Sequence, residues 1–449
     1  MASHVRNPIV AAAFFAAACA VPSPLRAQEP LPLRLSFSDA IRRVTGDAPP
    51  PIVEIAGLRE EQSRAQVTQA RSGLLPSIGL SGSWANRTVN PRAVGFSFPG
   101  VPNLIGPFDV VDGRVSLQQT IFDFSNLKRV RAAKSQVTAA TAEGNATEEA
   151  SAQNVAVAYA RATRAQAVVG ARRADSSLAA ELVTLAIAQQ QAGVSASIDV
   201  TRARVQLSES AGRLILAQSQ LERARIDLAR SLGLDTGGGT PIELTDTLST
   251  ELGAATVPAD RAAAIAQALA QRPDLAAELA RGTAARTAAS AISAERMPRI
   301  GLAADYGVSG NQFPDAVTTR AVAVQVTLPV LDGWRREGRL AEQQAVARQS
   351  DVRARDLRQQ VAADVDGALL DLRSAAAQQM ITRERLRLAT EEVSQARQRF
   401  EAGVAGNIEV ITAQESLERA READIDARFA ALTARIALAR SVGSAHTLH

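Results

Sequence analysis

The chain has 449 residues, of which only three are histidine and one is cysteine. His4 and Cys19 lie near the N-terminus, and His446 and His449 lie at the C-terminal end, where we expect a frayed tail. A body without His or Cys excludes Ser-His-Asp and Cys-His catalysis and the usual zinc and copper sites. Carboxylate-only chemistry stays open, but no motif points to it, so we do not expect an enzyme. The net charge of +4 is small against 50 basic and 46 acidic residues, which indicates a mixed solvated surface and no nucleic-acid interface.

Residues 1–27 have the plan of a secretory signal peptide. A basic start is followed by an apolar run over residues 9–20 that is too short to span a bilayer. Cleavage after Ala27 or after Ala20 would leave small residues at the cut, and lipidation at Cys19 is the alternative. No later stretch reaches about 18 apolar residues, so integration of the mature chain into a membrane would require β-strands.

The rest of the chain is a tandem duplication with an offset of about 210 residues. Three pairs of segments match in the same order: LPSIGL at 75–80 with MPRIGL at 297–302, VSLQQTIFD at 115–123 with VQVTLPVLD at 324–332, and QAGVSASIDV at 191–200 with EAGVAGNIEV at 401–410. We therefore expect a first repeat over 28–236, a linker over 237–260 and a second repeat over 261–449.

Each repeat begins with a helix that ends at a proline, over 54–74 and 274–296, and continues with two strands of alternating apolar and polar residues. The strands are expected at about 77–90 and 113–124, and at about 299–309 and 320–331. Nine of the fifteen aromatic residues lie in 77–124 and 299–334, as in the aromatic girdles of membrane barrels. The alternative is an ordinary hairpin packed on the helices. Four strands leave open edges in lipid, so a barrel would have to be shared by several protomers.

Helical periodicity follows each pair of strands for about 65 to 70 residues, up to Gly193 and Gly403, and a helix of about 35 residues returns. An unbroken helix of the longer kind would extend roughly 100 Å, which no ordinary globular domain needs. Both glycines are expected to be structural turn residues that let the chain reverse direction. The Ala-, Arg-, Gln- and Glu-rich composition suits long helices packed side by side.

These features resemble the TolC-type outer-membrane efflux family over nearly all of the mature chain. The resemblance rests on LSFSDAI at 35–41, Leu75-Pro76, QRPDL at 271–275, LPVLDGWRR at 328–336 and the Gly-x-x-x-x-x-Asp-Val type of turn at Gly193 and Gly403. It implies a mostly α fold with a β-barrel part, in which tandem-duplicated helical hairpins form a periplasmic tunnel. Four transmembrane strands per chain would contribute to a shared trimeric 12-stranded barrel.

The resemblance further implies a homotrimer in the outer membrane of a Gram-negative bacterium, in contact with its lipid. The homotrimer would dock a periplasmic adaptor and an inner-membrane pump. It would conduct substrates passively to the exterior, in a tripartite efflux or type I secretion system. The stretch TGDAPPP at 45–51 departs from the plain helix common near the start of family members.

The resemblance also assigns Asp199 and Glu409 to an acidic constriction at the periplasmic mouth. A ring of carboxylates there would favour cations and latch the mouth. Two positions depart from the family pattern, since Thr412 replaces a second acid and Ala405 replaces a basic residue, and both changes favour a less tightly latched mouth. Independently of any gate, acids in a first helical turn interact favourably with the helix dipole.

Two alternatives remain. A soluble periplasmic coiled-coil adaptor or scaffold would be expected to carry a single helical hairpin and a lipoyl-like or barrel domain, whereas this chain interleaves two strand pairs with two helical hairpins. Asp364, Asp366 and Asp371 share one helix and could mark a divalent cation site, although a solvated or tunnel-lining face is favoured. Pro273 and Asp274 fit an ordinary helix start.

Overall fold

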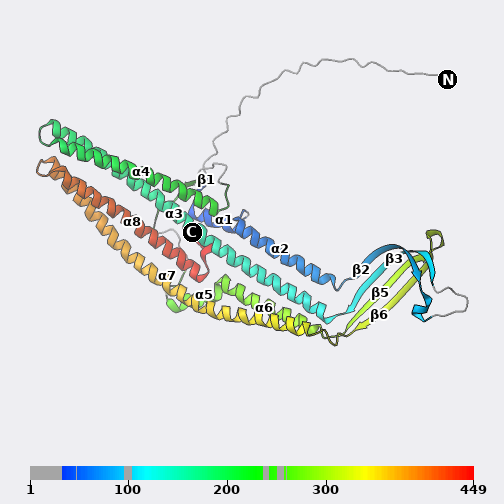
Figure 1. Ribbon diagram of the computed structural model, residues 1–449. Helices are drawn as coiled ribbons and strands as arrows, with labels where there is room; N and C mark the ends of the chain where they lie inside the picture. Colours follow the sequence, from blue (N-terminus) through cyan, green and yellow to red (C-terminus); the bar gives the residue numbers. More distant parts are fainter. Residues whose placement is uncertain are drawn as a thin grey trace, which may run out of the picture.

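The computed structural model describes residues 33–46, 48–95, 104–235, 242–249, 257–258 and 260–448, with the side chains of Arg92 and Val94 excepted. The expected signal segment, with Cys19, lies outside these residues. The molecule is elongated, with a four-stranded sheet at one end and the tips of two helical hairpins at the other (Figure 1). Among the helices that the structure describes, none has the length and apolar character needed to cross a membrane.

Two very long helices extend along most of the helical part, and each is followed by a shorter returning helix. Helix α3 (Phe124–Gln191) has 68 residues and α7 (Arg335–Glu401) has 67. They are followed by α4 (Ser197–Ser231) with 35 residues and α8 (Asn407–Val442) with 36. The helical hairpins predicted for both repeats are therefore confirmed.

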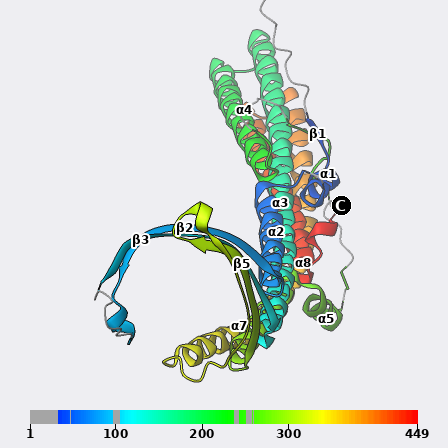
Figure 2. The same cartoon turned by 90° about the vertical axis from the view of Figure 1, so that its right-hand side faces the viewer.

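Helices and strands continue into one another as a single wall. Helix α2 (Pro51–Ser72) leads into β2 (Ser77–Val89), and β3 (Ile105–Phe122) leads into α3. In the second repeat, α6 (Pro273–Ala294) leads into β5 (Arg299–Gly310), and β6 (Val317–Thr327) leads into α7. The helices pack in the order α2, α3, α6, α7, and the strands pair in the matching order β2-β3-β5-β6. Because the orders agree, the chain forms a curved strip with two free edges (Figure 2).

The sheet has one apolar face. Ile78, Leu117, Ala304 and Val322 lie in one cross-strand row, because each is in register with the next across three antiparallel pairings. Ile78 and Val322 are largely exposed in the single chain, as is Trp84. An apolar face of this kind on strands is the pattern of a lipid-facing surface.

Three strand boundaries differ from the prediction by three residues or more, and one of them is the start of β6 at Val317 rather than near residue 320. Strand β3 begins at Ile105 rather than near residue 113, because Phe108 pairs with Arg87 although the Gly and Pro content of this stretch favours a loop. Strand β6 ends at Thr327 rather than near residue 331, because Pro329 has no N–H to continue the ladder.

A belt of short elements packs against the middle of α3 on one side. It contains α1 (Phe37–Thr45) and the parallel pair β1 (Leu33–Leu35) and β4 (Ile242–Leu244), and α5 (Arg261–Gln271) packs nearby on α7. The hydroxyl of the buried Tyr159 of α3 lies 3.0 Å from the Leu35 carbonyl oxygen and 2.9 Å from the Asp246 carboxylate, and these two acceptors share its single proton. Strand β4 and Asp246 both lie in the expected linker 237–260, which therefore includes ordered structure. The division into repeats at the boundaries given above stays a prediction.

The expectation of a frayed tail is wrong for His446. The buried carboxylate of Glu149, on α3, accepts the backbone N–H of Ala445 at 2.6 Å and that of His446 at 3.2 Å. The His446 ring lies 2.6 Å from the same carboxylate through Nδ1. Short 3₁₀ elements form here (Ala445–Thr447), at Pro91–Val94 and at Phe313–Asp315. His449 lies outside the described residues.

Candidate functional site

The two hairpin tips share one backbone turn. Gly193 and Gly403 adopt φ values of +74° and +69°, in the left-handed region that glycine enters without steric cost. The backbone N–H of Val194 bonds to the Gln189 carbonyl at 2.9 Å, and that of Val404 bonds to the Arg399 carbonyl at 3.0 Å. The tips also touch, because a Cβ atom on Gly403 would lie 3.3 Å from the Val194 side chain.

Asp199 and Glu409 both lie in the first turn of the returning helices, α4 and α8. The Asp199 side chain is 13% exposed and lies 3.8 Å from Arg202, whereas the Glu409 side chain is 41% exposed and lies 3.4 Å from Arg399. No hydrogen bond or ion pair joins the two carboxylates in the described part of the chain. Their position agrees with a favourable helix-dipole interaction, and the constriction role stays a prediction.

The two positions that depart from the family pattern add no link between the tips among the described residues. The hydroxyl of Thr412 bonds within its own helix, to the Ile408 carbonyl at 2.9 Å. Ala405 is partly buried in the turn.

Apolar packing joins the two hairpins behind the tips. The buried side chains come from all four helices and are centred on Phe400, with Leu182 from α3, Val200 from α4 and Ile411 from α8. The Gln189 amide also donates to the Phe400 carbonyl at 2.7 Å. Opening of the tips would therefore have to separate buried apolar surface as well as polar contacts.

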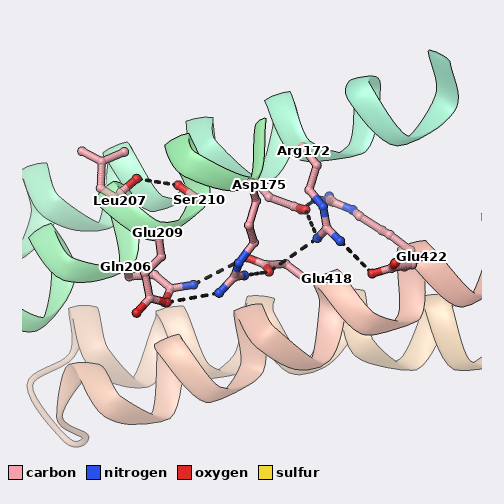
Figure 3. A network of polar contacts seen from close by, with 10 residues as sticks. Arg172, Asp175, Gln206, Leu207, Glu209, Ser210, Glu418 and Glu422 are labelled. Carbon is pink, nitrogen blue, oxygen red and sulfur yellow. Dashed lines mark hydrogen bonds and ion pairs between the residues drawn. The ribbon is translucent and has the colours of Figure 1, made fainter. Parts of the chain in front are cut away.

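Further along the hairpins, charged side chains from three helices meet (Figure 3). We call this set the charge cluster; its members are Arg172 and Asp175 of α3, Glu209 and Arg213 of α4, and Glu418, Arg421 and Glu422 of α8. It links the hairpin of the first repeat to α8 of the second.

Two buried carboxylates form the centre of the charge cluster. Asp175, whose side chain is 3% exposed, pairs with Arg421 and lies 3.5 Å from Arg172. Glu418, whose side chain is 9% exposed, accepts from Arg213 and lies 3.6 Å from Arg172. Buried ion pairs gain little net stability, but loss of one partner leaves an uncompensated charge that costs several kcal/mol.

Burial raises the pKa of the Glu418 carboxyl above its ordinary value of 4.5. The loss of solvation is the largest cause, and the attraction of Arg213 and Arg172 only partly offsets it. The neighbouring Asp175 charge raises this pKa further. Burial therefore disfavours the ionised form of Glu418 at a structural contact between the hairpins.

Sequence reasoning did not identify the charge cluster. The only available signal was helical spacing, since Arg172 and Asp175 lie three residues apart, as do Glu418 and Arg421. Such spacing is common on solvated helix faces. Only the approach of α3, α4 and α8 distinguishes the cluster.

The three aspartates that could have marked a cation site are engaged differently. Asp364 accepts from Arg272 at 2.6 Å, and Asp366 forms two bonds of 2.6 Å with Arg261. Asp371 is exposed. Across the described residues, no group of three or more His, Cys, Asp or Glu side chains could hold a metal ion.

Long duplicated helical hairpins continuous with a short antiparallel sheet define the class of outer-membrane exit channels. The chain belongs to the outer membrane efflux protein family, whose model matches residues 51–234 and 264–444. The protein is thus an outer-membrane exit duct with a tunnel in the periplasm of a Gram-negative bacterium.

Solved structures and curated relatives agree with this family. The fold is similar to that of CusC, with a TM-score of 0.76 and 18% identity over 91% of this chain and 92% of that chain. It is also similar to that of VceC from Vibrio cholerae, with a TM-score of 0.75 and 20% identity over 91% and 96%. Protein CyaE of Bordetella pertussis is 29% identical over 370 residues, which cover 80% of this chain and 74% of CyaE. The pyoverdine export outer membrane protein OpmQ of Pseudomonas putida is 25% identical over 272 residues, covering 58% and 55%.

Proposed function

We propose that three copies of this chain share one 12-stranded barrel and one helical tunnel, through which substrates pass without a catalytic step. The observation that carries the shared barrel is the strip with two free edges, formed by β2 and α2 on one side and by β6 and α7 on the other, and the number of three copies rests on family membership. Unpaired strand edges are not tolerated in lipid, so the edge of one chain pairs with the opposite edge of the next. The exposed apolar strand face supports the same arrangement.

The duct would receive its substrates from an inner-membrane pump through a periplasmic adaptor that docks near the hairpin tips. This part of the proposal rests on family membership and covers both tripartite efflux and type I secretion. The energy would come from the pump, so the chain itself needs no cofactor.

Asp199 and Glu409 would form the acidic constriction of the mouth. In the trimer each position is repeated three times around the axis, which places carboxylates in rings and favours cations. Their location in the first turns behind Gly193 and Gly403 supports this role.

Single-channel recording in planar lipid bilayers tests both parts of the proposal. We expect stable, cation-preferring current steps from the wild-type protein, and larger or less selective steps from Asp199→Ala combined with Glu409→Ala. Glu384→Ala combined with Glu391→Ala is a matched control, because both glutamates are exposed partners of Arg387 on α7 and lie away from the turns. Unchanged current steps in the Asp199 and Glu409 variant would contradict the constriction role of these two residues, but would still support the duct. A monomeric, electrically silent protein that stays in solution without detergent would refute the duct assembly.

A further inference from the structure

An arginine-rich cavity lies at the junction where the strands continue into the helices. Its volume is about 230 Å³, and its lining includes five arginines from three elements, α3, β5 and α7: Arg129, Arg299, Arg335, Arg336 and Arg339. Only two carboxylates, Glu295 and Asp332, line the same cavity. We call this space the junction cavity. Its lining has an excess of three positive charges.

The two carboxylates are already engaged by three of the five arginines. Glu295 is shared between Arg129 at 3.4 Å and Arg339 at 3.0 Å. Asp332 lies 3.3 Å from Arg336, whose side chain is buried.

Arg299 and Arg335 are both exposed, and neither side chain forms a hydrogen bond or ion pair with another described residue. Within the described part of the single chain, the charges of these two guanidinium groups are therefore not compensated by a carboxylate.

Strand alternation places the junction cavity on the polar side of the sheet. Arg299 is the first residue of β5, and Asp305 lies on the same face because successive side chains alternate between faces. Asp305 is ion-paired with Arg114 of β3 at 2.7 Å. The opposite face of β5 carries Ile300 and Leu302. In a membrane barrel the polar face is the one that lines the water-filled interior.

We propose that the junction cavity is an anion-binding site on the duct side, which holds a carboxylate- or phosphate-bearing group of a passing solute. The planar guanidinium fork matches both groups with paired hydrogen bonds. A concave surface lined by one sign of charge also concentrates counter-ions.

The volume limits the ligand. Sites that enclose a drug-sized molecule measure roughly 300–1,000 Å³, so a smaller cavity suits one anionic group rather than a whole solute. The excess of three charges favours a multivalent anion. The proposal rests on the chain being an exit duct and is independent of the acidic mouth.

Isothermal titration calorimetry with citrate tests the site on the purified full-length protein in zwitterionic detergent. We expect Arg299→Gln combined with Arg335→Gln to weaken citrate binding about tenfold or more, because two charge-assisted contacts are lost. Arg296→Gln is the matched control, since Arg296 lies at the same junction but is paired with Glu337 and lines a neighbouring cavity. The control should bind citrate as the wild type does. Equal elution of all variants in size-exclusion chromatography shows that assembly is intact. Equal citrate affinity in wild type and double variant would overturn the site.

Planar bilayers then establish which side the site faces. In phosphatidylcholine bilayers, citrate should reduce the wild-type current at concentrations that leave the double variant unaffected, while both give the same steps in KCl alone. Replacing part of the lipid with phosphatidylglycerol should not change this block if the cavity faces the duct. Loss of the block in phosphatidylglycerol would show that a lipid headgroup fills the cavity, and would overturn the duct-side position. Absence of conducting steps in KCl would contradict the duct itself and not the citrate site measured by calorimetry.

Discussion

The side-chain amide of Asn407 donates a hydrogen bond of 2.6 Å to the backbone carbonyl of Asp199. This bond joins the first turn of α8 to the first turn of α4, so it connects the two hairpin tips across the duplication. Asn407 is fully buried, at 0% exposure. The corresponding residue of the first repeat is Ser197, which is exposed. In the described part of the chain, Ser197 forms no equivalent bond to the backbone carbonyl of Glu409.

We expect Asn407→Ala to loosen the contact between the tips. Loss of a hydrogen bond to a carbonyl in a partly buried site costs about 1–2 kcal/mol. The ratio of open to closed dwell times in planar bilayers should therefore rise about tenfold. Ser197→Ala changes the equivalent position without removing this bond and should leave the ratio unchanged. Equal dwell times in both variants would contradict a latching role for Asn407.

Asp175→Ala should be strongly destabilising. It leaves Arg421 without its buried partner and removes one of the three carboxylates near Arg172, and breaking a buried pair in this way costs about 3–5 kcal/mol. Asp426→Ala is the control, because the pair of Asp426 with Arg164 is at least one-third exposed on both sides and contributes about 1 kcal/mol or less. Denaturant unfolding followed by circular dichroism compares the two. A similar midpoint shift for both variants would show that the cluster is solvated.

Glu418 should give the protein a specific pH dependence. Its pKa is raised in the folded state, so the folded protein holds this proton more tightly than the unfolded chain does. The unfavourable contribution of the ionised carboxylate is absent below about pH 4.5 and is complete above the raised pKa. Glu418→Gln removes this titration. The stability of the variant relative to wild type should therefore increase as the pH rises through that window, as measured by thermal unfolding at a series of pH values. A difference that is independent of pH would show that Glu418 is not desolvated.

Tyr159→Phe should weaken the belt on α3. The buried hydroxyl bonds to the Leu35 carbonyl and to Asp246, and its loss should cost about 1–3 kcal/mol. The other tyrosine of the chain, Tyr306, is exposed on β5, so Tyr306→Phe is a natural control with almost no expected effect. Resistance of the chain to limited proteolysis near β1 gives the readout. Equal resistance would mean that the belt is held by its apolar contacts alone.

Helical and strand periodicity predicted most of the architecture. The long helices and their turns at Gly193 and Gly403 follow from local spacing, because a helix or strand repeats its pattern within a few residues. Boundaries were less predictable. The early start of β3 depends on pairing with Arg87, which no local pattern reveals.

Long-range polar contacts could not be predicted. Glu418 resembles any helix-surface glutamate in sequence, and its surroundings come from α3 and α4, which are more than 200 residues away in the chain. The order of His446 likewise depends on Glu149, almost 300 residues earlier. The acidic turn positions were placed correctly on their helices, whereas their role in a constriction still depends on neighbouring protomers.

The shared backbone turn of the two hairpins has a consequence for stoichiometry. In the proposed trimer, six tips would surround the periplasmic entrance, three from each repeat. A partner protein that recognises only the backbone shape of the turn around Gly193 or Gly403 would find six equivalent binding positions. A partner that recognises Glu409, whose counterpart is the more buried Asp199, would find three. The number of partner copies bound at saturation would therefore reveal which of the two features is recognised.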